Sequence, residues 1–244
     1  MYHPFSVAET TKTAWDIFKN NFITIIVYSA ISFFLLSVLA FVTQFIILPD
    51  ELEFTGQIVV SFILVFIQAY TTLGLYKLIF TVIDSEYYEF EISQVLPSFK
   101  MIISYLTVVF LIAFLITTFH FLILRLDDYP NISNTANVLA TLVGLYLALR
   151  IMFFNTFIVD DQSGAFESLS QSFELTRGYF FKVLTMLIII LVLIALPALA
   201  SQYYPFISLA IIFTYPFVNI LLAVTYRKLV YSHKDVDDDI AETN

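Results

Sequence analysis

Six apolar stretches, each long enough to cross a membrane as a helix, constrain the fold of this chain more than any other feature. They cover roughly residues 22–48, 57–83, 101–124, 137–159, 183–200 and 206–226. A helix needs about 20 predominantly apolar residues to cross the hydrocarbon core, whereas the strands of a membrane barrel alternate over about ten residues. Because these stretches are apolar on every face, the sequence predicts an all-α integral membrane protein with six transmembrane helices.

The overall composition leads to the same class of protein. Of the 244 residues, 60% are hydrophobic and only 13% are charged, against about 25% charged residues in a soluble domain. Burial in a soluble core could explain one such apolar stretch, but not six in succession. The chain has no Cys, which excludes disulfides, thiolate metal ligands and cysteine nucleophiles.

The distribution of Lys and Arg predicts the orientation, because short cytoplasmic loops are enriched in these residues. If the N-terminus is cytoplasmic, most of the basic residues fall on the cytoplasmic side: Lys12, Lys19, Lys100, Arg177, Lys182, Arg227, Lys228 and Lys234. Lys77 and Arg150 then lie toward the cytoplasmic ends of the second and fourth helices, and only Arg125 lies outside. We therefore expect both termini in the cytoplasm.

A short polar–apolar segment that ends in a cation precedes each odd-numbered apolar stretch. Two copies are TAWDIFKNNF at 13–22 and SFELTRGYF at 172–180, with a weaker third copy at 94–103. Around the second copy, aromatic and aliphatic residues recur on one side of a helix and Glu and Gln on the other, a pattern typical of interfacial helices. The sequence predicts three transmembrane hairpins, each preceded by a cytoplasmic amphipathic helix. Duplication and membrane-entry chemistry alone both explain the repeat.

Cap residues mark the expected starts of two of these surface helices. Ser6 and Glu9 have the spacing of a capping box, in which each side chain bonds the backbone N–H of the other residue. Ser163 is expected to cap the helix that follows it. Residues 1–233 then form a single six-helix domain, and the acidic segment KDVDDDIAETN at 234–244 is expected to be a disordered tail.

Motifs for catalysis or metal binding are missing from the sequence. His3, His120 and His233 are far apart, and no HExxH, P-loop, GxSxG or GxGxxG pattern occurs. Loop solvation and helix-start electrostatics explain the paired acids at 127–128 and 160–161. The sequence predicts no catalytic residue, no metal and no cofactor. Nucleic acid is an unsuitable partner, because Lys and Arg are not clustered as phosphate binding requires.

Arg150 is the most informative polar residue, since it lies about nine residues inside its apolar stretch, where a lone cation costs roughly 2.5–3.5 kcal/mol. We expect it to pair with an acid or with carbonyls, with Asp160, Glu167 and the Asn155 amide as candidates, and so dock the surface helix onto the bundle. Binding of an anionic headgroup or solute is the alternative. Together with Arg177, these residues form the candidate polar cluster. Three further amides, Gln44, Gln68 and Asn219, are expected to form interhelical hydrogen bonds.

The segment YLALRIMFFNTFIVDDQSGAFESLSQSFELTRGYFFK at 146–182 resembles YciC-like and DUF975-like integral membrane proteins and the membrane domain of bacterial glycerophosphodiester phosphodiesterases. The matching residues are Arg150, Asp160, Gly164, Ser168, Leu169, Ser172, Leu175, Thr176, Arg177 and Gly178. The segments AWDIFKNNF and YRKL also look similar. The family's usual Pro is missing around Asn155, and Ser168 replaces its usual Ala. The resemblance implies a six-helix protein of the bacterial inner membrane, without the separate barrel that carries the phosphodiesterase activity.

These features together predict a non-enzymatic, multi-pass inner-membrane protein that acts as a lipid- or protein-interacting scaffold or regulator. The expected partners are the bilayer, a bound phospholipid and a membrane protein. The alternative is a small-solute or lipid transporter with a polar site around Arg150, and a membrane enzyme comes third. A cavity at mid-depth lined by Arg150, Gln68 or Asn219 would favour the transporter, whereas a dry, aromatic-packed bundle would count against it.

Overall fold

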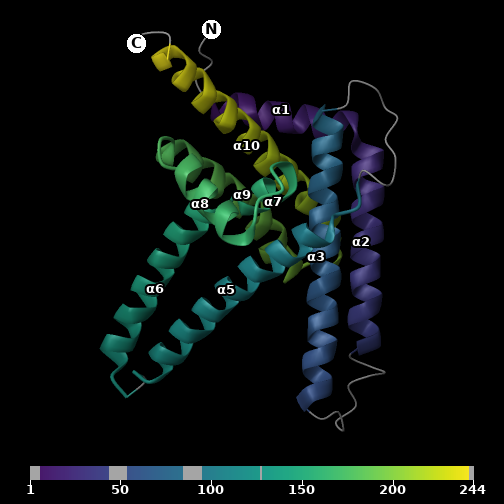
Figure 1. The fold of residues 1–244 in the computed structure, drawn as a ribbon. Coiled ribbons are helices and arrows are strands. Elements are labelled where there is room, and N and C mark those ends of the chain that lie inside the picture. The colour runs from purple at the N-terminus through teal and green to yellow at the C-terminus, as the bar shows by residue number, and fades with distance from the viewer. Residues whose placement is uncertain (1–5, 44–53, 85–94, 127, 242–244) are drawn as a thin grey trace.

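A computed structural model of the chain describes residues 6–43, 54–84, 95–126 and 128–241, and every regular element in these ranges is a helix (Figure 1). The elements are α1 (Val7–Asn20), α2 (Phe22–Val42), α3 (Phe54–Asp84), α5 (Phe99–Leu124), α6 (Pro130–Ile151), α7 (Phe154–Asp160), α8 (Ala165–Leu175), α9 (Phe180–Ser201), the 3-10 helix η2 (Pro205–Ala210) and α10 (Ile211–Ala241).

Six helical segments in the described ranges are long and apolar enough to cross a membrane. They are Phe22–Val42, Gly56–Asp84, Phe99–Leu124, Pro130–Asp160, Phe180–Ser201 and Phe206–Tyr231. The predicted all-α class with six membrane-spanning helices is therefore confirmed. The fourth segment consists of two helices, α6 and α7, with a break between them.

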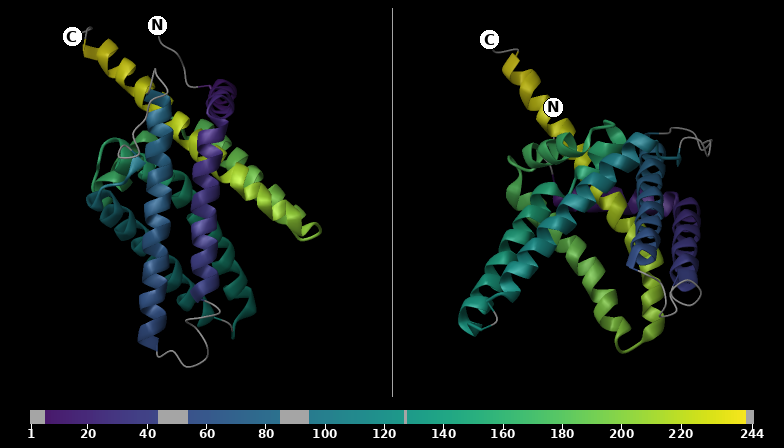
Figure 2. Two further views of the ribbon diagram at one scale, coloured as in Figure 1. Left: turned by 90° about the vertical axis from the view of Figure 1, so that its right-hand side faces the viewer. Right: turned by 60° about the horizontal axis from the view of Figure 1, so that its bottom comes forward.

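The helices converge at one end of the molecule and spread apart at the other. At the first end, which we call the terminal end, α1 lies across the start of α2 (Figure 1). It runs beside α10, where it contacts Phe217 and Lys228. There α3 contacts α2, α5, α7 and α10. Away from the terminal end, α5 and α6 diverge from α2 and α3 (Figures 1 and 2).

Burial follows this arrangement. The buried residues of α5 lie between Met101 and Val108, near its start, and those of α9 lie between Val183 and Ile190. Large apolar side chains farther along the same helices are exposed, such as Phe110 on α5. Lipid tails are as apolar as leucine side chains, so the bilayer supplies no hydrophobic force that would close the bundle along its whole length.

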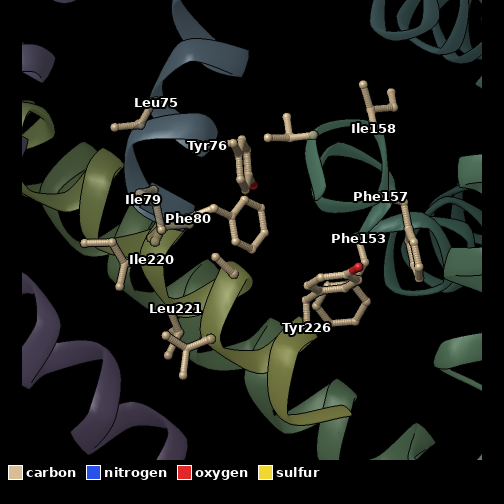
Figure 3. Close-up of a cluster of buried hydrophobic side chains, with 14 of the residues drawn as sticks. Leu75, Tyr76, Ile79, Phe80, Phe153, Phe157, Ile158, Ile220, Leu221 and Tyr226 are labelled. Atoms are coloured by element: carbon tan, nitrogen blue, oxygen red, sulfur yellow. The ribbon is translucent and has the colours of Figure 1, made fainter. Parts of the chain in front are cut away.

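An aromatic cluster forms the centre of the packed region (Figure 3). The Tyr226 ring of α10 meets the Phe157 ring of α7 edge to face, with centroids 4.9 Å apart, and the Phe80 ring of α3 at 6.0 Å. Such pairs stabilise a fold by about 0.5–1.5 kcal/mol each beyond their buried area. The cluster therefore joins three helices that are distant in sequence.

Close packing of α2 on α3 depends on Gly74. The Tyr28 hydroxyl of α2 donates to the Thr71 carbonyl at 3.0 Å, and a Cβ atom on Gly74 would collide with that hydroxyl. We expect Gly74→Ala to displace Tyr28 and to lower the free energy of unfolding by about 1–3 kcal/mol, as measured by denaturant titration in mixed micelles. Gly144→Ala is the matched control, because nothing lies within 4 Å of its added methyl group. If the two variants were equally stable, the packing of Tyr28 on α3 would not depend on Gly74.

The helix starts differ from the predicted caps. Ser6 does precede α1, but its side chain makes no capping hydrogen bond, and Glu9 instead binds Lys228 of α10 at 2.7 Å. The Ser163 hydroxyl donates to Gln171 Oε1 at 2.7 Å, so it does not cap α8. The Ser163 prediction is wrong because its hydroxyl bonds Gln171 instead, and the Ser6 hydroxyl does not cap α1.

Two segments predicted from the sequence extend beyond the described residues. The third polar–apolar copy includes residue 94, which lies outside the described residues, as do residues 242–244. The backbone of α10 is helical as far as Ala241 and so continues into the acidic segment. Disorder of that segment stays a prediction.

Candidate functional site

Charged residues join the last residues of two helices to the middle of a third at the terminal end. Arg227 of α10 donates from one nitrogen, Nη2, to Asp84 Oδ2 at 2.7 Å and to Asp160 Oδ1 at 2.9 Å. Asp84 is the last residue of α3, and Asp160 is the last residue of α7. With Tyr226, these residues form a group that we call the Arg227 cluster.

Tyr226 and Phe80 complete the surroundings of this ion pair. The buried Tyr226 hydroxyl donates to Asp160 Oδ2 at 2.9 Å, so both oxygens of that carboxylate accept hydrogen bonds. The Arg227 guanidinium carbon lies 5.0 Å from the centre of the Phe80 ring, within the range of a cation–π contact. Charge-assisted hydrogen bonds of this kind are about twice as strong as neutral ones, and they fasten α3 and α7 to α10.

Sequence reasoning identified Asp160 but gave it the wrong partner. Asp84 and Arg227 were not among the predicted site residues. Arg227 does lie in the YRKL segment at 226–229, which contributed to the family resemblance. The contacts of Arg227 cross 143 positions to Asp84 and 67 positions to Asp160. No local spacing rule connects residues so far apart.

The break between α6 and α7 is bridged by a serine of α8. The Ser172 hydroxyl donates to the Arg150 carbonyl at 2.8 Å and accepts the Phe153 N–H at 3.2 Å. A side chain inserted into the backbone ladder is one of the established causes of a helix kink. Ser172 therefore replaces the helix bonds lost at the break, and no proline is needed there.

Arg150 lies beside this break and does not pair with an acid. Its guanidinium carbon is 5.0 Å from the centre of the Phe173 ring of α8, and no ion pair to it occurs within the described ranges. Asp160 binds Arg227, and Glu167 Oε2 accepts the Gly164 N–H at 3.1 Å. The expected pairing of Arg150 with Asp160, Glu167 or Asn155 is therefore wrong. An aromatic ring and a backbone carbonyl connect Arg150 to α8 instead.

The predicted cluster is thus divided over separate places. Asp160 belongs to the Arg227 cluster, and Arg150 lies with Ser172 at the helix break. Glu167 caps the start of α8, whereas the exposed Arg177 follows its end, where its backbone N–H donates to the Glu174 carbonyl at 3.0 Å. The Oδ1 atom of Asn155 is buried and has no hydrogen-bond partner in the described structure.

The face of α8 that packs on the bundle carries small polar residues. Its buried residues are Ser168, Ser172 and Leu175, while Phe166 is 72% exposed. Small side chains let helices approach closely, and hydroxyls bond across the contact. The serines that carry the resemblance in this segment therefore form its packing surface.

Pockets lie among the membrane-spanning helices of the described ranges, and two of them contain amides named above. One, of about 170 Å³, lies between α2, α3 and α10 and is lined in part by Gln68. The other, of about 390 Å³, lies between α9, η2 and α10 and is lined in part by Asn219. Tyr215 lines both, and Arg150 lines neither. The amide of Asn219 donates to the Tyr215 carbonyl of its own helix at 2.7 Å rather than across helices.

Comparison with protein-family models, with curated proteins and with solved structures finds no match for this chain. The resemblance carried by residues 146–182 therefore stays a prediction.

Proposed function

We propose that this protein is a non-enzymatic, multi-pass protein of the bacterial inner membrane that acts as a lipid- or protein-interacting scaffold or regulator. The observation that carries the proposal is the contrast between the two ends of the molecule. Charged residues of the terminal end bind one another in the Arg227 cluster and between Glu9 and Lys228. The diverging ends of α5 and α6 instead expose apolar side chains such as Phe121 and Ile132, a surface suited to lipid tails or to a partner's helices.

The proposal includes an orientation, in which the terminal end is cytoplasmic and the six helices form three hairpins. Its support is the position of α1, which lies across the start of α2 (Figure 1) and exposes Trp15 and Lys19, residue types that favour the membrane interface. We expect a fluorescent-protein fusion after residue 244 to fluoresce, and alkaline phosphatase inserted at Asp128 to be active. The opposite pattern would overturn the orientation.

Native mass spectrometry of protein extracted in mild detergent tests the interaction itself. We expect retained phospholipid or a co-purifying membrane protein. Protein that is stripped in a harsher detergent and then supplied with phospholipid is the control, because stoichiometric rebinding distinguishes a bound lipid from residual bilayer. Folded protein that retains neither lipid nor partner, and rebinds no lipid, would contradict the proposal.

A transporter is the second candidate, and the two pockets favour it. Gln68 and Asn219 each line one of them, although the predicted involvement of Arg150 finds no support in their lining. A transporter should raise the rate at which proteoliposomes swell in a gradient of an uncharged solute such as glycerol. Gln68→Leu should reduce that rate, and swelling no faster than that of empty liposomes would exclude this activity for the solute tested.

A further inference from the structure

The pocket between α2, α3 and α10 is polar without being charged. Its hydrogen-bonding side chains include Tyr28, Ser29, Ser32, Gln68, Thr71 and Thr72, and among the described residues no Asp, Glu, Lys, Arg or His lines it. Ser29 lies about 10 Å along α2 from its first residue, at about 1.5 Å per residue. The pocket therefore lies within the membrane-spanning segments, where any ligand must lose its water shell on entry.

Most of these hydroxyls already have partners within the protein. Tyr28 donates to the Thr71 carbonyl at 3.0 Å, Thr71 donates to the Ile67 carbonyl at 3.1 Å, and Thr72 lies 3.2 Å from the Tyr215 hydroxyl. The bonds of Tyr28 and Thr72 join α2 and α10 to α3, and that of Thr71 stays within α3.

Ser29 differs from its neighbours. The residue is 6% exposed, and its hydroxyl is buried without a hydrogen-bond partner in the described structure. Buried polar groups in proteins are nearly always hydrogen-bonded, so an exception calls for a missing partner. Because Ser29 lines the pocket, a ligand in the pocket can supply that partner.

The lining also limits the chemistry of the ligand. A phosphate or a carboxylate would be desolvated with no cation to receive it, which disfavours charged headgroups. The apolar residues Phe33, Leu36 and Ile211 line the same pocket and suit a hydrocarbon chain. A volume of about 170 Å³ equals that of roughly five or six waters at about 30 Å³ each, which is enough for a glycerol-sized group but not for a whole lipid.

We propose that this pocket binds the hydroxyl-bearing head of an uncharged glycerolipid such as diacylglycerol. Ser29 Oγ and the Gln68 amide hydrogen-bond its hydroxyl and ester groups, and the acyl chains lie outside along the apolar surface of α2. The inference rests on the proposed lipid-interacting function and names the class of lipid and its site.

Photocrosslinking of the purified full-length protein tests the site. The probes are a diazirine-bearing diacylglycerol and a phosphatidic acid with the same acyl chains. We expect the diacylglycerol probe to label peptides of α2, α3 and α10, and unlabelled diacylglycerol to compete. Ser29→Ala should reduce labelling roughly 2- to 10-fold, the loss of one hydrogen bond. Gln68→Leu should reduce it too, whereas Ser37→Ala, an exposed position on α2 outside the pocket, should not.

Measurements of Tm distinguish a loss of lipid binding from a loss of folding. Because the Ser29 hydroxyl has no protein partner, Ser29→Ala should unfold without added lipid at the same temperature as the wild type or higher, and should lose the increase in Tm that diacylglycerol gives the wild type. A lower Tm without lipid would overturn the inference. So would equal labelling by the phosphatidic acid probe, competition by free glycerol, or unchanged labelling of Ser29→Ala.

Different results would reject the diacylglycerol site and the proposed lipid-interacting function. Protein that retains phospholipid in native mass spectra but binds no diacylglycerol keeps the lipid-interacting function and rejects this pocket. Protein that binds neither rejects both.

Discussion

Arg227→Ala is expected to lower the free energy of unfolding by about 3 kcal/mol. The change leaves Asp84 and Asp160 without the cation that they share, and it removes the cation–π contact with Phe80. Removing one partner of a buried ion pair costs about 3–5 kcal/mol. The low end applies here, since the side chains of Arg227 and Asp160 are 20% and 19% exposed and that of Asp84 is 56% exposed. Denaturant titration in mixed micelles measures the change.

Two further variants separate the geometry of Arg227 from its charge. Arg227→Lys keeps the positive charge but lacks the guanidinium group, whose Nη2 contacts both carboxylates and which lies over the Phe80 ring, so its stability should lie between those of the wild type and Arg227→Ala. Arg177→Ala removes an exposed arginine that has no ion pair among the described residues, and it should change stability by no more than about 0.5 kcal/mol. If Arg227→Ala were as stable as Arg177→Ala, the cluster would not hold the helix ends together.

The membrane-spanning helices were predictable because their length follows directly from the thickness of the bilayer. The third span was predicted to begin at residue 101 and begins at Phe99. The fourth was predicted to begin at residue 137 but starts at Pro130, because proline at the first helical position allows the helix to include the polar PNISNTAN segment. Apolar length alone cannot detect such a polar first turn.

The polar contacts were less predictable, because each depends on which faces meet after folding. The pattern around α8 predicted an aromatic face toward the membrane but did not identify the face that packs on the protein, which contains Ser168 and Ser172. Arg150 was correctly selected as unusual, but its partner is a ring rather than a carboxylate. The contact of Tyr28 over Gly74 was not predicted either, because it depends on which faces of α2 and α3 meet.

Ser172→Ala should destabilise the protein by about 2 kcal/mol or more, despite removing a single oxygen atom. Its hydroxyl serves both the Arg150 carbonyl and the Phe153 N–H, and the residue is completely buried, so water cannot easily replace it. Each buried backbone group left unpaired costs about 1–3 kcal/mol.

Hydrogen exchange at the Phe153 amide provides a second measurement of the same change, because the loss of its acceptor should accelerate exchange at the break more than elsewhere in α6. Ser170→Ala is the control, since Ser170 is exposed on the same helix and its replacement should change stability by no more than about 0.5 kcal/mol. If Ser172→Ala retained both wild-type stability and slow exchange at Phe153, then α6 and α7 would hold their break without α8. The packing of α8 on α6 would then depend on the contact between Arg150 and Phe173.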